Sequence, residues 1–553
     1  MKTFCSCSLG LFGLLLAPVA FGVATGVEVD PAVAATRGVA QPHLRVTAWE
    51  LRDQTDGVGE LVQKRAWLLL PGTGGFDLTG NVVDVQDVVT GAGAVYLRLA
   101  PLPGSRNWVG PDFRVKPGTR EGVEVVERDC RTLKIAYAGG ETGRRAALMK
   151  AQRELRPFVP GRDGLFLSNT WGDRNRDARL CEPFMLKEIA AAAELGVDVV
   201  QIDDGWQKGR TANSSAAKGK GVWDGYWASD PDFWKPDPVR FPNGLKPLVV
   251  AAAAKGMGLG LWFGPDSSHD AANWERDADL LLDYHRTLGI NYFKIDSLKT
   301  RSPQSLQNQA ALFDKVLKGS SNRVVFDLDV TAERRPGYFG LPEIGPVFVE
   351  NRYTDWHKYW PHQTLRQFWA LCDVVDPVRL RMEILNPLRH ADLYANDPLA
   401  PSNWPVESVF ASVMLGSPLG WFEASGLAPE TKAKLAPFVA TWKRHRDRLH
   451  AGVVHPVGAK PDGVSWTGFV VQGEESLDVL LFRELNASDK YLLDLTPYGV
   501  SCAGAGKSDS VPVEVLSPRG SAERRAGSLL VSVPDKLDFI WVRSPLWGAS
   551  LIF

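Results

Sequence analysis

The chain has 553 residues, of which 44% are hydrophobic and 23% charged, as is ordinary for a globular protein of two or three domains. Its 63 Lys and Arg residues almost balance its 64 Asp and Glu residues. A nucleic-acid-binding surface needs a concentrated basic excess, so this balance argues against that class and no nucleic-acid partner is expected. The nineteen tryptophans allow stacking on sugars, although most of them must fill cores.

The first 24 residues are predicted to form a secretory signal peptide. Lys2 precedes a run, residues 9–24, that carries no charge and is rich in Leu, Val, Ala and Gly. This run is short for a membrane span of about 20 residues, so an uncleaved anchor is the weaker alternative. We therefore expect a secreted or periplasmic protein with no membrane association after cleavage.

Four cysteines would remain in the mature chain: Cys130, Cys181, Cys372 and Cys502. They form no Cys-x-x-Cys pair and have no histidine cluster nearby. The sequence therefore indicates neither a zinc site nor a disulfide scaffold, and a single disulfide bridge stays open.

Three domains follow from changes in the hydrophobic period. Residues 27–150 contain short apolar runs between Gly, Pro and Asp clusters, which is typical of an antiparallel β domain. The same pattern of short apolar runs recurs over residues 455–553, where it predicts a C-terminal antiparallel β-sandwich. Between these regions, residues 160–452 alternate strand-like and helix-like segments.

The middle region is predicted to be an α/β domain of the (β/α)8 TIM-barrel type. Eight strand candidates are present, and seven of them precede a plausible helix. Such alternation over roughly 290 residues implies a parallel sheet, and eight units close a barrel. A doubly wound open sheet is the alternative, but Gly172-Asp-Arg-Asn after the first strand is no Gly-rich phosphate loop. The strand candidates are 164–171, 197–206, 257–266, 290–297, 323–331, 347–356, 379–387 and 418–425.

Polar residues should gather at the carboxyl ends of these strands and nowhere else on them, because active sites of TIM barrels lie there. Six strand ends fit this expectation and together describe an acidic pocket with an aromatic rim. Strands two to seven end in Gln201-Ile-Asp-Asp-Gly-Trp206, Leu261-Trp-Phe-Gly-Pro-Asp266, Lys294-Ile-Asp296, Asp327-Leu-Asp-Val-Thr331, Glu350-Asn-Arg-Tyr-Thr-Asp355 and Glu383-Ile-Leu-Asn386.

The strand-four end carries Lys294 and Asp296 two positions apart, so both side chains point to the same face. Taken alone, this pair reads as a solvent-facing ion pair, but its place among the other polar strand ends favours a site. Clustered carboxylates suit glycoside hydrolysis, in which one carboxyl protonates the leaving oxygen and another attacks or activates water. They also suit Mg²⁺ or Ca²⁺, but Lys294 would repel a divalent ion and favour the ionised form of Asp296. We therefore expect no metal and no cofactor.

Three strand ends, Gln201-Ile-Asp-Asp-Gly-Trp206, Gly260-Leu-Trp-Phe263 and Phe293-Lys-Ile-Asp296, fall in order on strands two, three and four. In this they resemble the α-galactosidase clan of retaining glycoside hydrolases, clan D, and within it family 36 most closely, with family 27 as a cousin. The resemblance implies that Asp296 is the nucleophile that forms a glycosyl-enzyme intermediate. It also implies that Lys294 contacts sugar hydroxyls, and that Asp203 and Asp204 accept hydrogen bonds from the hydroxyls that distinguish galactose. Trp206 and Trp262 would wall the subsite.

The same resemblance places the general acid/base near the end of strand six. Asp355 is the candidate, with Arg352 as its expected partner for substrate hydroxyls or charge tuning, and Glu350 is the alternative. A purely structural salt bridge between Asp355 and Arg352 is the competing interpretation. A retaining mechanism requires the carboxyls of Asp296 and Asp355 to lie about 5 to 5.5 Å apart.

Two segments depart from the family pattern. Strand three reads Trp-Phe-Gly-Pro-Asp266 where a glutamate is usual after the phenylalanine, and Thr331-Ala-Glu-Arg-Arg-Pro-Gly337 replaces a Cys-Ser-Ser-Gly-Gly-Gly loop after strand five. Asp266 and Glu333 are the substrate-binding candidates in these segments. The departures bear on the choice of substrate more than on the chemistry, because the replaced loop shapes the pocket around the sugar.

The sequence thus predicts a secreted, retaining exo-α-galactosidase that removes terminal α-linked galactose from oligosaccharides or polysaccharides. Another α-glycosidase or a raffinose-synthase-type transglycosylase of the same clan is one alternative. A catalytically idle carbohydrate-binding barrel is another, against which the presence of both a candidate nucleophile and a candidate acid argues. The natural glycan and the oligomeric state stay open.

Overall fold

The computed structural model describes residues 27–28, 44–52, 60–69, 76–78, 82–99, 113–115, 123–125, 132–173, 175–215, 217, 220–329, 341–349, 352–500, 510–525 and 527–546. The expected signal peptide, Cys130, Cys502, Glu333 and Glu350 lie outside these residues. Within them, Cys181 and Cys372 carry free thiols. Of the helices in the described ranges, none is long and apolar enough to cross a membrane.

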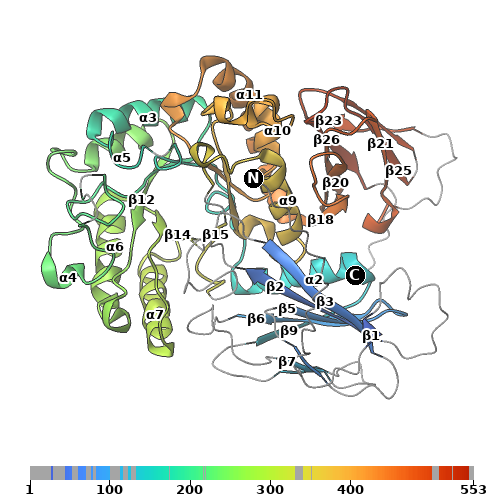
Figure 1. The fold of residues 1–553 in the computed structure, drawn as a ribbon, viewed down its shortest axis with the longest axis horizontal. Coiled ribbons are helices and arrows are strands. Elements are labelled where there is room, and N and C mark those ends of the chain that lie inside the picture. The colour runs from blue at the N-terminus through green and yellow to red at the C-terminus, as the bar shows by residue number, and fades with distance from the viewer. Residues whose placement is uncertain are drawn as a thin grey trace, which may run out of the picture.

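The central region closes into an eight-stranded parallel barrel, which confirms the predicted fold (Figure 1). The eighth strand pairs with the first, so that Leu167 and Ser168 lie opposite Leu419 and Gly420. Each strand is shorter than its predicted segment. The strands are β10 (Leu167–Asn169), β11 (Val199–Ile202), β12 (Gly258–Phe263), β13 (Tyr292–Ile295), β14 (Val325–Asp329), β15 (Val347–Phe348), β16 (Leu380–Ile384) and β17 (Ser417–Gly420).

Helices connect the strands along the outside of the barrel (Figure 1). One begins with a capping box, in which the side chains of Ser302 and Ser305 each accept a hydrogen bond from the other residue's backbone N–H. Another ends at Gly289, whose φ of 71° is a left-handed conformation that glycine adopts without steric cost. The helices are α3 (Glu182–Glu194), α4 (Tyr226–Ser229), α5 (Lys246–Ala253), α6 (Trp274–Leu288), α7 (Pro303–Gly319), α9 (Pro361–Leu371), α10 (Val406–Ala411) and α11 (Pro429–Ala451).

Two antiparallel sheets precede the barrel, in the strand orders β1-β3-β2-β5-β6-β9 and β4-β7-β8. Helix α2 (Gly140–Leu155) follows them, so the domain boundary predicted at residue 150 falls within a helix. The strands are β1 (Val27–Glu28), β2 (Leu44–Arg52), β3 (Glu60–Leu69), β4 (Phe76–Leu78), β5 (Val82–Asp87), β6 (Gly93–Arg98), β7 (Phe113–Val115), β8 (Val123–Val125) and β9 (Thr132–Tyr137).

Two further antiparallel sheets follow the barrel, in the orders β18-β19-β20-β26-β23 and β21-β25-β24-β22. Apolar side chains from both sheets form a second buried cluster, as the predicted sandwich requires. The strands are β18 (Val453–Gly458), β19 (Trp466–Gln472), β20 (Ser476–Arg483), β21 (Lys490–Asp494), β22 (Ser510–Val511), β23 (Glu514–Val515), β24 (Ser521–Arg525), β25 (Ser528–Ser532) and β26 (Asp538–Pro545).

Both β regions flank the same side of the barrel, next to α9 (Figure 1). Arg144 and Arg145 of α2 pair with Asp373, just after α9, at 2.7 and 2.8 Å. On the sandwich side, the rings of Phe438 in α11 and Phe539 in β26 lie 5.2 Å apart between centroids. A single continuous set of buried apolar side chains therefore runs from the N-terminal sheet through the barrel into the sandwich.

The barrel interior also holds a buried ion pair below the strand ends. Arg381 of β16 donates to Asp327 of β14 at 3.1 Å, and to the backbone carbonyls of Leu165 and Pro418 at 2.7 and 3.3 Å. The prediction that polar residues occur only at the carboxyl ends of the strands is therefore wrong. Asp327, which the sequence places in the pocket, serves as the counter-ion of an arginine that braces neighbouring strands.

Candidate active site

Lys294 of β13 lies at the centre of a buried polar cluster at the carboxyl ends of the strands. Its Nζ is 3.0 Å from Oδ2 of Asp203 and 4.0 Å from Oδ2 of Asp329, and 4.5 Å from the centroid of the Trp421 ring. Burial disfavours the charge, but Asp203, Asp329 and Asp296 more than offset it, so the pKa of Lys294 is raised. The lysine is therefore a fixed cation surrounded by carboxylates and an aromatic face.

Asp296 directly follows β13 and is a partly exposed residue. Trp262 Nε1 donates to Oδ2 at 3.1 Å, and the backbone N–H of Ser297 donates to Oδ1 at 2.6 Å. Hydrogen bonds of this kind favour the ionised carboxylate and fix its direction. Ser297 itself has a φ of 58°, a conformation uncommon for a residue with a Cβ, so the backbone next to Asp296 is constrained.

Asp203 and Asp204 follow β11 and are both buried. Oδ2 of Asp203 accepts hydrogen bonds from Asn169 at 2.7 Å and from Lys294 at 3.0 Å. Asp204 accepts hydrogen bonds from the side chains of Gln207 and Thr211. Burial raises the pKa of Asp204 to about 7 although these donors act in the opposite direction. Asp203 thus belongs to the lysine cluster, whereas Asp204 is held by its own loop.

Both expected subsite tryptophans are nearly inaccessible. Trp206 is 1% exposed, packs against Trp234 and Tyr284, and donates its Nε1 proton to the carbonyl of Trp262. The ring thus packs within an aromatic cluster, and its part in walling the subsite stays a prediction. Trp262 is equally buried, but its Nε1 proton goes to Asp296, so it acts on the pocket through that carboxyl.

Asp266 is hydrogen-bonded to the loop that follows β12. Its Oδ1 accepts from the backbone N–H groups of Gly225 and Ser268 at 2.8 and 3.0 Å, and its Oδ2 accepts from Asn273 at 3.0 Å. It is fully buried. Both oxygens therefore hold the loop after β12, and substrate binding by Asp266 stays a prediction.

Of the residues that follow strand six, some lie near the lysine cluster and others point elsewhere. Asp355 lies exposed on the 3₁₀ helix η3 (Thr354–Trp356), and the ring of the preceding Tyr353 is 6.3 Å from that of Trp421. Arg352 is buried, its backbone N–H donates to Glu383, and its guanidinium lines a groove beside α9. The pairing of Asp296 with Asp355 stays a prediction, as does the part played by Arg352.

Three residues of the cluster were missed among the predicted site residues. Asn169 ends the first strand, whose predicted segment carries no charge, and Trp421 directly follows the eighth strand. Asp329 was visible at the end of strand five, where period-2 alternation puts it on the same face as Asp327, but only the structure distinguishes their depths. In the described part of the chain, no three His, Cys, Asp or Glu residues are grouped in a way that could hold a metal ion.

Comparison with known proteins gives matches of two kinds, while no protein-family model matches the chain. An α-galactosidase of Escherichia coli is 34% identical over 83 residues, which are 15% of this chain and 10% of that protein. A probable α-galactosidase G of Aspergillus terreus is 32% identical over 107 residues, 18% of this chain and 13% of the relative. The chain thus matches only about a tenth of the length of these curated relatives.

Among solved structures, the family 36 α-galactosidase AgaA of Geobacillus stearothermophilus matches 91% of this chain and 75% of its own, with 13% identity and a TM-score of 0.59. The galactosidase domain of the α-galactosidase–sucrose kinase AgaSK matches 92% and 74%, with 14% identity and a TM-score of 0.61. At such identities the likeness establishes the fold.

Fold and site together define a (β/α)8-barrel protein with flanking β domains and a lysine–carboxylate cluster at the carboxyl ends of its strands. Within that class, the chain has the fold of the family 36 α-galactosidases, and its short sequence matches are to α-galactosidases. The resemblance that the three strand-end motifs predict is confirmed.

Proposed function

We propose that this chain is an exported glycoside hydrolase that releases terminal α-linked galactose with retention of configuration. The position of Asp296 is the observation that carries the proposal. This partly exposed residue lies at the carboxyl end of a barrel strand, both carboxyl oxygens are held by N–H donors, and the charge of Lys294 acts on it. An ionised and oriented carboxylate is what a glycosidase nucleophile requires.

In the first step, Asp296 attacks the anomeric carbon while the bond to the leaving oxygen breaks and Asp355 protonates that oxygen. In the second step, Asp355 accepts a proton from a water molecule that attacks the same carbon and releases Asp296. Two inversions give net retention. Lys294 and Asp203 present charged groups to the hydroxyls of the bound sugar.

Asp296→Ala tests the nucleophile directly. The variant should lose hydrolysis of para-nitrophenyl α-galactoside, and added azide should restore turnover by forming β-galactosyl azide in a single inversion. Asp327→Asn is the matched control, because this buried aspartate belongs to the structural ion pair. Undiminished hydrolysis by Asp296→Ala would remove Asp296 from the mechanism, and an α-configured azide product would contradict the retaining scheme.

Asp355→Asn tests the acid/base and distinguishes it from Glu350→Gln. Loss of a general acid harms poor leaving groups most, so hydrolysis of raffinose should fall by about 10²- to 10⁴-fold, and hydrolysis of an activated aryl galactoside much less. Structures of AgaA variants have been solved with raffinose and with stachyose, which makes these sugars suitable first substrates. The same pattern in Glu350→Gln instead would reassign the role.

A different α-glycosidase of the clan is the second candidate, and one observation favours it. Asp204, expected to recognise galactose, has both carboxyl oxygens engaged by Gln207 and Thr211. A panel of para-nitrophenyl α-glycosides on one preparation decides between the candidates: a preference for glucoside or N-acetylgalactosaminide over galactoside would replace the galactose assignment.

Export rests on residues 1–24. Amino-terminal sequencing of the protein recovered from the periplasm or medium should begin near residues 24–35, where small residues allow cleavage. Recovery of the full chain with Met1 in the cytoplasm would contradict export. It would leave the proposed hydrolysis unaffected.

A further inference from the structure

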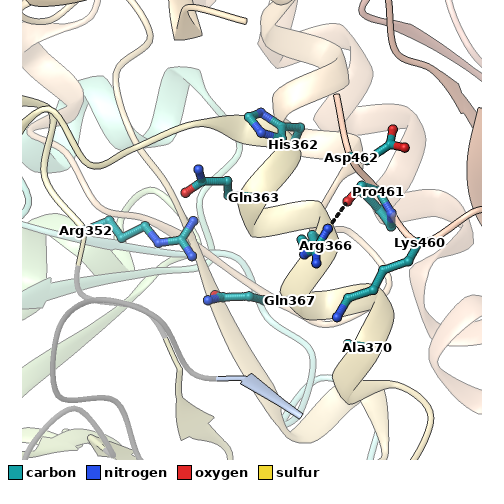
Figure 2. A pocket seen from close by; sticks show the side chains of 9 residues that line it. All are labelled: Arg352, His362, Gln363, Arg366, Gln367, Ala370, Lys460, Pro461 and Asp462. Atoms are coloured by element: carbon teal, nitrogen blue, oxygen red, sulfur yellow. Dashed lines mark hydrogen bonds between the residues drawn. The ribbon is translucent and has the colours of Figure 1, made fainter. Parts of the chain in front are cut away.

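Neighbouring residues of the segment after β15 lie in different surroundings. Arg352 is buried, and Figure 2 shows its guanidinium directed toward Gln363 and Gln367 of α9, in a groove outside the barrel. The four residues 355–358 are instead exposed. The exposed part of this segment therefore contains the candidate acid/base, Asp355, and the aromatic residue that follows it.

That residue, Trp356, is exposed to an extent that sets it apart from the other aromatic side chains. It is 48% exposed, whereas the other exposed large hydrophobic side chains in the described ranges are all valines or leucines. Two of those leucines, Leu388 and Leu393, lie on the loop after β16. An exposed indole forgoes the stabilisation that burial would give, so apolar surface left open beside a catalytic candidate indicates a place where a ligand binds.

Trp356 is held in place by contacts with two loops. Its backbone N–H donates to the carbonyl of Tyr353 at 3.3 Å, and the two rings pack edge to face with their centroids 4.7 Å apart. The hydroxyl of Thr354 lies 2.9 Å from Nδ1 of His390, and the hydroxyl of Tyr394 donates to the carbonyl of Thr354 at 3.4 Å. The indole is therefore a surface fixed before any ligand arrives.

A row of aromatic rings connects Trp356 to the lysine cluster. The centroid of the Trp421 ring lies 4.5 Å from Nζ of Lys294, and the ring of Tyr353 lies between those of Trp421 and Trp356, at 6.3 and 4.7 Å. In the proposed mechanism, the galactose binds at the lysine cluster and Asp355 protonates the oxygen that joins it to the leaving group. The leaving group therefore lies beside Asp355, on the side of Trp356.

We propose that Trp356 is a specificity-determining residue, whose indole stacks on the sugar unit that leaves when the α-galactoside bond is broken. This inference rests on the proposed hydrolysis and adds the class of leaving group: a hexopyranose, whose C–H face matches a flat aromatic ring. Nζ of Lys358 lies 5.9 Å from the centroid of the indole, where an ammonium can donate to hydroxyls at the edge of the stacked sugar.

Kinetics of the full-length protein with raffinose and with α-galactosyl fluoride test this role, because a fluoride leaving group has no ring to stack. In Trp356→Leu, which stays apolar but lacks a flat ring, KM for raffinose should rise about tenfold at nearly constant kcat, and kcat/KM for the fluoride should fall much less. Trp356→Phe should retain most of the affinity for raffinose. Leu492→Ala, which removes an exposed apolar side chain from β21, is the matched control and should keep the wild-type KM for both substrates.

Three results would overturn the role of Trp356 alone, in a wild type that hydrolyses both substrates. They are equal losses on raffinose and the fluoride in Trp356→Leu, no loss on either substrate, and the same rise of the raffinose KM in Trp356→Phe as in Trp356→Leu. A wild type that hydrolyses neither substrate would overturn the proposed function, and the role of Trp356 with it.

Discussion

The barrel contains two buried ion pairs that differ in the groups to which they connect. Arg381 and Asp327 are 3% and 5% exposed, and Lys294 and Asp203 are 6% and 3% exposed, so burial does not distinguish them. The remaining donors of Arg381 go to backbone carbonyls, which closes that network. The lysine cluster instead continues into Asp296, which is a partly exposed residue.

The two networks differ in whether the buried charge connects to a partly exposed group, and this difference is what the proposed function of the lysine cluster depends on. The planar guanidinium of Arg381 binds several fixed acceptors, which suits a brace between strands. The ammonium of Lys294 is a compact charge that faces Asp203, Asp329 and the ring of Trp421. Substitutions at matched positions of the two networks should therefore separate activity from stability.

The largest change in activity is expected from substituting Asp296, which is compared with substituting Asp327. Asp296→Asn should reduce kcat for para-nitrophenyl α-galactoside by roughly four orders of magnitude with little change in Tm. Asp327→Asn should lower Tm, because it leaves Arg381 buried without a counter-ion, while the folded fraction keeps its kcat. Steady-state kinetics and thermal melting of both variants check this, and a catalytic loss in Asp327→Asn at full Tm would break the comparison.

The next effect concerns the stability of the structural pair. Arg381→Met should destabilise the fold by about 3–5 kcal/mol, because breaking a buried pair leaves the Asp327 carboxylate uncompensated. The double variant Arg381→Met, Asp327→Leu should recover most of that loss, since two apolar side chains can replace a buried pair. Denaturant unfolding of the single and double variants gives the coupling free energy between the two side chains. Additive losses of unfolding free energy would show that the two side chains act independently.

A smaller effect should appear in the pH dependence of activity. Lys294→Met removes the cation that acts on Asp296, so the acidic limb of the kcat/KM profile should move up by about one pH unit or more. Lys315→Met, which breaks a surface pair with Asp279, serves as the control and should leave the profile unchanged. An unshifted limb in Lys294→Met would mean that the lysine does not tune the essential carboxyl.

The smallest effect is expected in the pH dependence of stability. Burial raises the pKa of Asp204 to about 7, so between about pH 4 and pH 7 the folded chain binds this proton more tightly than the unfolded chain. That group therefore makes Tm fall as pH rises through this window. Asp204→Asn should flatten the slope, whereas Asp314→Asn, in an exposed pair with Lys318, should not. An unchanged slope in Asp204→Asn would show that the carboxyl stays ionised in the fold.

The sequence determined the fold class because periodicity is a local property of the chain. Alternating apolar strands and amphipathic helices predicted the barrel, and all eight strands form within or next to the predicted segments. Helix ends followed local signals too, such as Ser302 at the start of α7 and Gly289 at the end of α6. Lys294, Asp203 and Asp296 could be grouped in advance because parallel strands bring their carboxyl ends to one rim.

How deeply each side chain near the strand ends is buried was decided only by the tertiary structure. Trp206 and Asp266 read as pocket residues because they follow strands, but one packs into an aromatic core and the other builds a loop. Trp421 joins the lysine cluster from the segment directly after β17, and Gln367 is an ordinary helix residue until α9 and the loop after β18 meet. The reason is physical: alternation fixes the face on which a side chain lies, while burial, partners and charge depend on residues far apart in the chain.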